Sequence, residues 1–310
     1  MNRVAKKRKL TKQSNGRISK YYIFGIVASF LIGMLSLVGV QWWGRHQLEE
    51  NDHLQPLKIT NLTYCNGEKL DMIVSNGGNK PLVVYIHGGG WQYGSKVGGA
   101  TPFFMQLVER GYAVASINYR LSDRVKFPNQ IYDVQCAVRF IKTNAELFGV
   151  DGNNIVLAGL SSGANLALMA GLNGGDLPQE NKLFSQQTND VQGIIAMSAH
   201  YDLTDPLLSA ETKENIAKYL SNKNMARNAS PINYLNKPIP ILLFHGKNDR
   251  NITIEQATNF YERAHQAGYP VQLVEVKNAD HNLWSWFGRD SPNSGERLDL
   301  ILKFLDEVVR

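Results

Sequence analysis

The chain has 310 residues, which allows one large domain or two small ones, and 43% of them are hydrophobic, as in an ordinary globular protein. Its net charge of +6 comes from residues 1–20, which carry no acidic side chain and eight basic ones: Arg3, Lys6, Lys7, Arg8, Lys9, Lys12, Arg17 and Lys20. Taking these eight charges from +6 leaves −2 for everything downstream. The basicity belongs to a tail, so it gives no support for a nucleic-acid-binding fold, and we expect no nucleic-acid partner.

An uncharged apolar stretch, residues 21–43, follows the tail and has aromatic residues at both ends. A membrane-spanning helix needs about 20 apolar residues, and Tyr and Trp favour the membrane interface. The alternative is a cleavable signal peptide, whose apolar region is about 7–15 residues long and ends in a small-residue cleavage site. The stretch here is longer and lacks that site. We therefore expect a single-pass membrane anchor, with the tail in the cytoplasm and an extracytoplasmic domain at 57–310 after a polar linker at 44–56.

Beyond the linker, short β-branched or apolar segments alternate with helical patterns. Two segments flanking Asn66-Gly67 predict a hairpin. Further strands are predicted at 81–87, 112–119, 154–160, 193–200, 239–245 and 271–277, and helices at 129–147, 162–172, 253–268 and 295–309. Strands that are apolar on both faces suit a parallel sheet covered by helices. The alternation predicts an α/β fold with a doubly wound, mostly parallel sheet.

Smaller features of this pattern carry further expectations. Thr253, followed three residues later by Gln256, is typical of a capping box at a helix start. Residues 203–237 hold no strand pattern, so we expect a small helical cap there, over the site. Asp133 is interpreted as a polar group at a packing interface. Cys136 is interpreted as a small core residue, and its pairing with Cys65, which an exported domain would allow, is left open.

The segment Gly159-Leu160-Ser161-Ser162-Gly163 lies between a predicted strand and a predicted helix. This is the context that a G-x-S-x-G nucleophile elbow requires. The sharp turn demands small flanking residues and exposes the central serine at the carboxyl edge of the sheet. Ser161 is therefore the candidate nucleophile.

A serine hydroxyl needs a base to take its proton. His281 follows the last predicted strand and Asp249 follows the strand before it, so the chain order is Ser161, Asp249, His281, the order of α/β-hydrolases. Asp249 could instead be a turn residue and His281 a surface histidine. Asp280 competes for the orienting role, although adjacent side chains rarely face each other. The other histidines at strand ends, His200 and His245, are interpreted as structural or pocket-lining.

Three consecutive glycines end the segment Tyr85–Trp91, directly after a predicted strand. A glycine-rich loop at this place can turn its amides toward a developing oxyanion. The candidate donors are the amides of Gly89, Gly90 and Ser162, and His87 is expected to brace the loop. A phosphate-binding loop is the alternative, but its G-x-x-x-x-G-K-[ST] and G-x-G-x-x-G patterns are missing.

From about Leu57 to Arg310 the chain resembles an α/β-hydrolase of the HGGG-containing esterase/lipase type, between the hormone-sensitive-lipase-like and the feruloyl- or acetyl-esterase-like groups. The resemblance rests on "HGGGW", "NYRLS", "YDVQCAVRFIKTN", "GLSSGAN", "SPINYL", "PILLFHGKND" and "DHNLW". Leu160 departs from the G-D-S-A-G-G elbow of many relatives. "HGGGW" also matches kynurenine-formamidase-like hydrolases, which keeps an amide substrate open.

Together these residues predict a serine hydrolase of carboxylic esters that uses the catalytic residues Ser161, Asp249 and His281. The expected substrate is a small-molecule or carbohydrate-linked acyl ester, with no cofactor and no metal, since no H-E-x-x-H or paired C-x-x-C is present. The alternatives are an amide hydrolase, formamidase-like or peptidase, and a catalytically inactive surface binding module. The aromatic residues after His281 are candidates for an acyl pocket, with an ordinary core or surface patch as the alternative: Trp284, Trp286 and Phe287.

Overall fold

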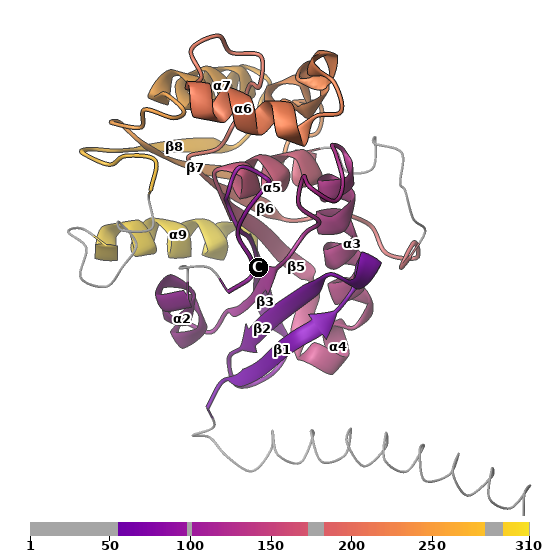
Figure 1. Cartoon of the computed structure of the whole chain (residues 1–310). Helices are drawn as coiled ribbons and strands as arrows, with labels where there is room; N and C mark the ends of the chain where they lie inside the picture. The colour runs from indigo at the N-terminus through magenta and orange to yellow at the C-terminus, as the bar shows by residue number, and fades with distance from the viewer. Residues whose placement is uncertain (1–54, 98–100, 173–182, 283–293, 310) are drawn as a thin grey trace, which may run out of the picture. The chain divides into compact units, whose positions relative to one another are not determined.

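The structure is a computed structural model that describes residues 55–97, 101–172, 183–282 and 294–309 (Figure 1). The predicted tail and membrane anchor lie outside these residues, as do Trp284, Trp286 and Phe287. No helix within the described ranges is both long enough and apolar enough to cross a membrane.

The described residues form one eight-stranded sheet, ordered β1-β2-β4-β3-β5-β6-β7-β8. Its strands are β1 (Leu57–Thr63), β2 (Lys69–Val74), β3 (Lys80–Ile86), β4 (Ala113–Ile117), β5 (Val150–Leu160), β6 (Gly193–Met197), β7 (Ile241–Gly246) and β8 (Val271–Val276). β2 pairs antiparallel with β1 and with β4, and the strands from β4 to β8 are parallel. The predicted mostly parallel α/β sheet and the hairpin at Asn66-Gly67 are confirmed.

Helices cover both faces of the sheet (Figure 1). α2 (Thr101–Glu109) and α9 (Ser294–Val308) pack on one face. α3 (Asn129–Thr143), α5 (Ser162–Leu172) and α7 (Ile254–Gln266) pack on the other. The side chains of β3 alternate between the two faces. Leu82, Val84 and Ile86 belong to the core on the face covered by α3, α5 and α7. Val83 and Tyr85 belong to the core on the face covered by α2 and α9. Both faces of the strand are therefore buried, which is why its sequence is continuously apolar.

The predicted cap at 203–237 is helical. It contains α6 (Ala210–Tyr219) and three single-turn 3-10 helices, Lys223–Met225, Arg227–Ala229 and Pro231–Asn233. α2, by contrast, lies where no helix was predicted. The helix predicted at 129–147 is interrupted at Asn144, where α3 ends before the short α4 (Ala145–Phe148).

The capping box predicted at Thr253 is wrong. Thr253 does precede α7, but its side chain makes no capping hydrogen bond. Gln256 is buried, and its Oε1 accepts from the backbone amides of Tyr201 and Asp202, both at 3.1 Å. The Gln256 side chain therefore holds the loop after β6 and is not available to the helix start. The helix stop predicted at Gly268 is confirmed, since α7 ends at Gln266 and Gly268 has a φ of 80°.

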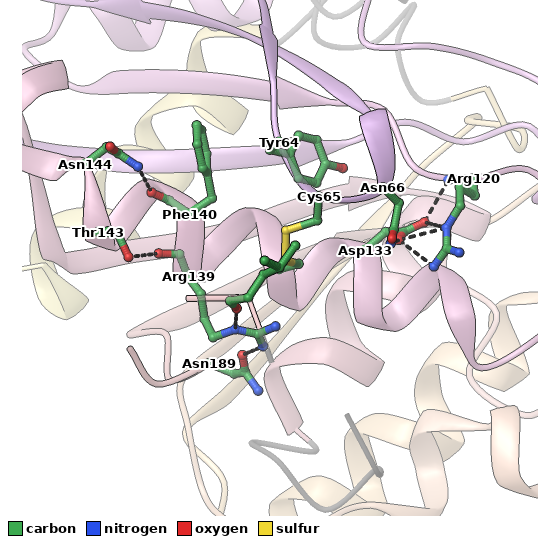
Figure 2. The surroundings of a disulfide bond; sticks show 12 residues. Tyr64, Cys65, Asn66, Arg120, Asp133, Arg139, Phe140, Thr143, Asn144 and Asn189 are labelled. Carbon is green, nitrogen blue, oxygen red and sulfur yellow. Dashed lines mark hydrogen bonds and ion pairs between the residues drawn. A yellow bond between two sulfur atoms is a disulfide. The ribbon is translucent and has the colours of Figure 1, made fainter. Parts of the chain in front are cut away.

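A disulfide between Cys65 and Cys136 joins the β1–β2 turn to α3, with the two Cα atoms 6.2 Å apart (Figure 2). Cys136 is therefore in the core, as predicted, but as half of a cross-link. Beside it, the Asp133 carboxylate accepts hydrogen bonds from the Arg120 side chain and, at 2.9 Å, from the Asn66 amide (Figure 2). Asp133 thus has the packing role predicted for it.

Reducing this disulfide is expected to lower the free energy of unfolding by about 2–4 kcal/mol, because a link between residues far apart in sequence restricts the unfolded chain. The two cysteines are separated by 71 positions. Guanidinium denaturation with and without dithiothreitol measures the change. A Cys65→Ala/Cys136→Ala variant should start from the lower stability and not respond to dithiothreitol. An unchanged midpoint on reduction of the wild type would refute the cross-link's contribution.

Candidate active site

The predicted site residues follow four parallel strands. The glycine loop follows β3, Ser161 follows β5, Asp249 follows β7 and His281 follows β8. Parallel strands end at one edge of a sheet, where α/β folds build their binding sites. The structure brings these residues together at that carboxyl edge.

Ser161 sits in a tight turn between β5 and α5, with a φ of 56°. Such a conformation costs free energy in a residue other than glycine and persists only when the surroundings enforce it. The Ser161 amide donates to Met197 O at 2.8 Å, and Ser161 O accepts from the Asn165 amide at 3.0 Å. These bonds tie the serine to β6 and to the first turn of α5.

The two glycines that flank this turn have no room for a side chain. A Cβ on Gly159 would lie 2.4 Å from Gly163 O, and one on Gly163 would lie 2.2 Å from Ile86 O. Both obstacles are backbone atoms, which cannot move aside easily. The spacing G-x-S-x-G is therefore a steric requirement of this turn, as the sequence predicted.

A chain of hydrogen bonds links the three predicted catalytic side chains. His281 Nε2 lies 2.9 Å from Ser161 Oγ, and His281 Nδ1 lies 2.8 Å from Asp249 Oδ2. A carboxylate only accepts hydrogen bonds, so Nδ1 carries the proton and Nε2 is free to accept from the serine hydroxyl. Ser161 is buried except for a small exposed fraction, while a quarter of the His281 side chain is exposed. Of the two side chains, His281 is therefore the one more accessible to solvent.

Asp249 is held by several partners. Its Oδ1 accepts from the amides of Asn251 and Ile252, each at 2.9 Å, and its Oδ2 also lies 3.4 Å from His245 Nε2. Burial, the largest single influence, raises the pKa of this carboxyl. The hydrogen bonds from His245 and His281 outweigh it together, so the pKa of Asp249 lies below its usual value. The carboxyl is ionised and fixed in orientation.

The competing residues have other partners or positions. Asp280 is exposed, and its Oδ1 accepts from the Asn282 amide at 2.9 Å. His245 is buried, and its Nε2 lies 2.8 Å from Ile252 O. The His200 ring centre lies 6.5 Å from that of His281, and burial lowers the pKa of His200 to about 3, which keeps it neutral. Among the described residues, no group of three or more His, Cys, Asp or Glu side chains is arranged to hold a metal ion.

The glycine loop lies against the elbow. A Cβ on Gly88 would lie 2.9 Å from Leu160 O, so the loop's backbone reaches the serine turn directly. Gly89 and Gly90 have φ angles of 118° and 59°, and Gly89 O accepts from the amides of Gln92 and Tyr93, each at 3.0 Å. Within the described part of the chain, no hydrogen bond is found from the amides of Gly89, Gly90 or Ser162.

His87 braces the loop, as predicted. Its Nδ1 lies 2.8 Å from Gly88 O, and its ring stacks on Tyr119 with the centres 4.3 Å apart. Burial lowers the pKa of His87, which favours the neutral ring that this packing requires.

Sequence reasoning missed the residues through which the cap touches this loop. The Asn215 side chain in α6 accepts a hydrogen bond from Gln92 Nε2, and the Trp91 ring stacks on Tyr219 with the centres 4.3 Å apart. These partners are more than 120 positions apart, so no local spacing pattern connects them.

A family model described as BD-FAE matches residues 70–264, more than half of the chain. The chain belongs to the BD-FAE family. The predicted resemblance to the esterase/lipase group is confirmed at this level.

The individual proteins that this BD-FAE family member resembles have low sequence identity to it. It is 28% identical to esterase LipC of Mycobacterium tuberculosis, over 74% of this chain and 59% of LipC. Among solved structures it resembles a truncated carbohydrate esterase from gut microbiota (TM-score 0.70, 21% identity, 83% and 99% of the two chains). It also resembles the Thermogutta terrifontis esterase Est2 with propionate bound (TM-score 0.67, 23% identity, 83% and 96%). The chain spans about half to three fifths of the length of the curated relatives it matches.

Proposed function

We propose that this BD-FAE family member is a serine hydrolase of carboxylic esters that works through an acyl-enzyme. The observation that carries the proposal is the hydrogen-bonded chain from Ser161 through His281 to Asp249. Ser161 Oγ attacks the ester carbonyl while His281 Nε2 takes its proton, and His281 then gives a proton to the leaving alcohol. Water hydrolyses the acyl-enzyme by the same steps. Asp249 fixes the histidine tautomer and stabilises the imidazolium.

The negative charge on the carbonyl oxygen would rest on the amides of Gly89, Gly90 and Ser162. The glycine loop lies against the serine turn, and Ser162 is the first residue of α5, where backbone amides have no partner within the helix. Donors of this kind contribute about 3–4 kcal/mol each to the stabilisation of the transition state. This arrangement supports acyl transfer rather than phosphate binding.

We propose a small-molecule or carbohydrate-linked acyl ester as the substrate. The support is that the proteins it resembles are an esterase, a carbohydrate esterase and an esterase with propionate bound. The same three side chains would also serve an amide hydrolase. A panel of short- and long-chain p-nitrophenyl esters, acetylated sugars and aminoacyl amides, assayed on the purified protein, tests the proposal. Turnover of amides with no turnover of esters would overturn it, and silence on every substrate would favour a binding module.

We also propose that residues 21–43 anchor the enzyme in the cell membrane, with the hydrolase domain outside the cytoplasm. The apolar stretch and the basic tail support this topology. The Cys65–Cys136 disulfide supports it independently, because disulfides persist in oxidising compartments. Protease added to intact cells should then digest the domain and leave the tail protected. A mature chain that begins near residue 41 would contradict the anchor.

A further inference from the structure

Helix α6 connects the two loops that carry the proposed acid and the proposed oxyanion donors. At its start, the Ser209 amide and Thr212 Oγ1 donate to Asn251 O at 3.4 and 3.3 Å. The Asn251 amide in turn donates to the Asp249 carboxylate at 2.9 Å. At its end, Tyr219 stacks on Trp91, with the ring planes 3° apart. The helix is therefore fixed at both ends to segments of the site.

The middle of α6 touches the glycine loop through one side chain. Asn215 Oδ1 accepts from Gln92 Nε2, and a Cβ built on Gly90 would lie 2.7 Å from Asn215 Nδ2. A side chain at position 90 would displace the Asn215 side chain, and the φ of 59° at this position also favours glycine. Asn215 thus contacts the residue proposed as an oxyanion donor and the residue two positions after it.

This contact addresses a mechanical problem of the loop. Glycines have more backbone freedom than other residues, so consecutive glycines do not hold a peptide plane by themselves. The bonds from Gln92 and Tyr93 fix the carbonyl of Gly89. That carbonyl and the Gly90 amide belong to one peptide, so the same bonds orient the Gly90 amide. Asn215 supports this arrangement from the cap, because it accepts a hydrogen bond from the Gln92 side chain and lies against Gly90.

We propose that Asn215 is a positioning residue that holds the Gly89–Gly90 amides in the orientation for oxyanion binding, with Gln92 as its partner. The proposal rests on the proposed hydrolase function and extends the site into the cap. It follows that α6 acts on the rate of the chemical step, beyond covering the site.

The test compares Asn215→Ala and Gln92→Ala with the wild type on a p-nitrophenyl ester that the wild type turns over. Each variant should lower kcat by about 10- to 100-fold, since displaced oxyanion donors act in the transition state, while KM changes by less than about twofold. Phenylboronic acid is the second probe. Ser161 Oγ bonds to its boron and the serine proton passes to His281, which leaves a tetrahedral anion in the oxyanion position. Its inhibition constant should rise in both variants in parallel with the fall in kcat/KM.

Glu214→Gln is the matched control, since Glu214 lies next to Asn215 in α6. Its exposed side chain forms an ion pair with Lys218 and with no other described residue. This variant should leave kcat and the inhibition constant of phenylboronic acid unchanged. Active sites are counted by fluorophosphonate titration, so loss of folded protein does not enter kcat. The Asn215→Ala/Gln92→Ala double variant should be no slower than the slower single variant, because the two substitutions remove the same hydrogen bond.

Two outcomes would overturn the proposal while leaving the hydrolase function standing. One is wild-type kcat in both single variants. The other is a raised KM with an unchanged inhibition constant for phenylboronic acid, which would make Asn215 a substrate contact. A wild type that neither turns over esters nor reacts with the fluorophosphonate would instead refute the proposed function, and this inference with it.

Discussion

Ser161→Ala is expected to lower kcat for ester hydrolysis by about 10⁵- to 10⁶-fold, the loss seen when a serine hydrolase loses its nucleophile. The hydroxyl is the group that His281 Nε2 contacts at 2.9 Å, and alanine leaves that nitrogen with no proton to take. A fluorophosphonate probe, which bonds to an activated serine oxygen and releases fluoride, should label the wild type and not the variant. Gel fluorescence and an ester assay measure the two effects.

Ser221→Ala serves as the matched control for labelling. Ser221 is exposed and its hydroxyl contacts only the Met225 sulfur among the described residues. This variant should label and turn over substrate like the wild type. Labelling that survives Ser161→Ala would show that another residue is the nucleophile, and the proposed mechanism would fall.

Asp249→Asn is expected to lower kcat by about 10⁴-fold while the domain stays folded. The amides of Asn251 and Ile252 donate to Oδ1, so the asparagine must keep its oxygen there and place its NH₂ at the position of Oδ2. That NH₂ would then face His281 Nδ1 as a donor. The histidine would carry its proton on Nε2 and could no longer accept one from Ser161. Initial rates at neutral pH measure the loss.

Asp280→Asn separates the two candidate acids. Asp280 adjoins His281 in sequence, but its carboxylate is exposed and caps the Asn282 amide. The change should leave kcat within about twofold of the wild type, as for a surface substitution away from the site. A large loss in Asp280→Asn together with a mild one in Asp249→Asn would reverse the assignment of the acid.

Much of this site was predictable because each part of it has a local sequence signal. The elbow needs glycines beside Ser161 for steric reasons that apply within five residues. Asp249 and His281 each follow an apolar strand, and parallel strands deliver their ends to one edge. The central strands β3, β4, β6 and β7 were predicted because burial of both faces makes their sequences almost continuously apolar.

The parts that were not predicted depend on contacts between distant segments. Gln256 has the spacing of a capping residue, yet the loop after β6 offers its side chain two amides. Nothing near Asn215 in the sequence indicates that Gly90 and Gln92 will lie against it. The pairing of Cys65 with Cys136 likewise required the hairpin and α3 to be placed first.

The Cys65–Cys136 link has a consequence for how the protein is produced. A chain synthesised in a reducing cytosol keeps both cysteines as thiols and lacks the cross-link between the hairpin and α3. Preparations from such a host and from an oxidising one, such as a bacterial periplasm, are therefore chemically different proteins. Purification buffers without thiol reductants, and a thiol count on each batch, belong in every comparison of variants.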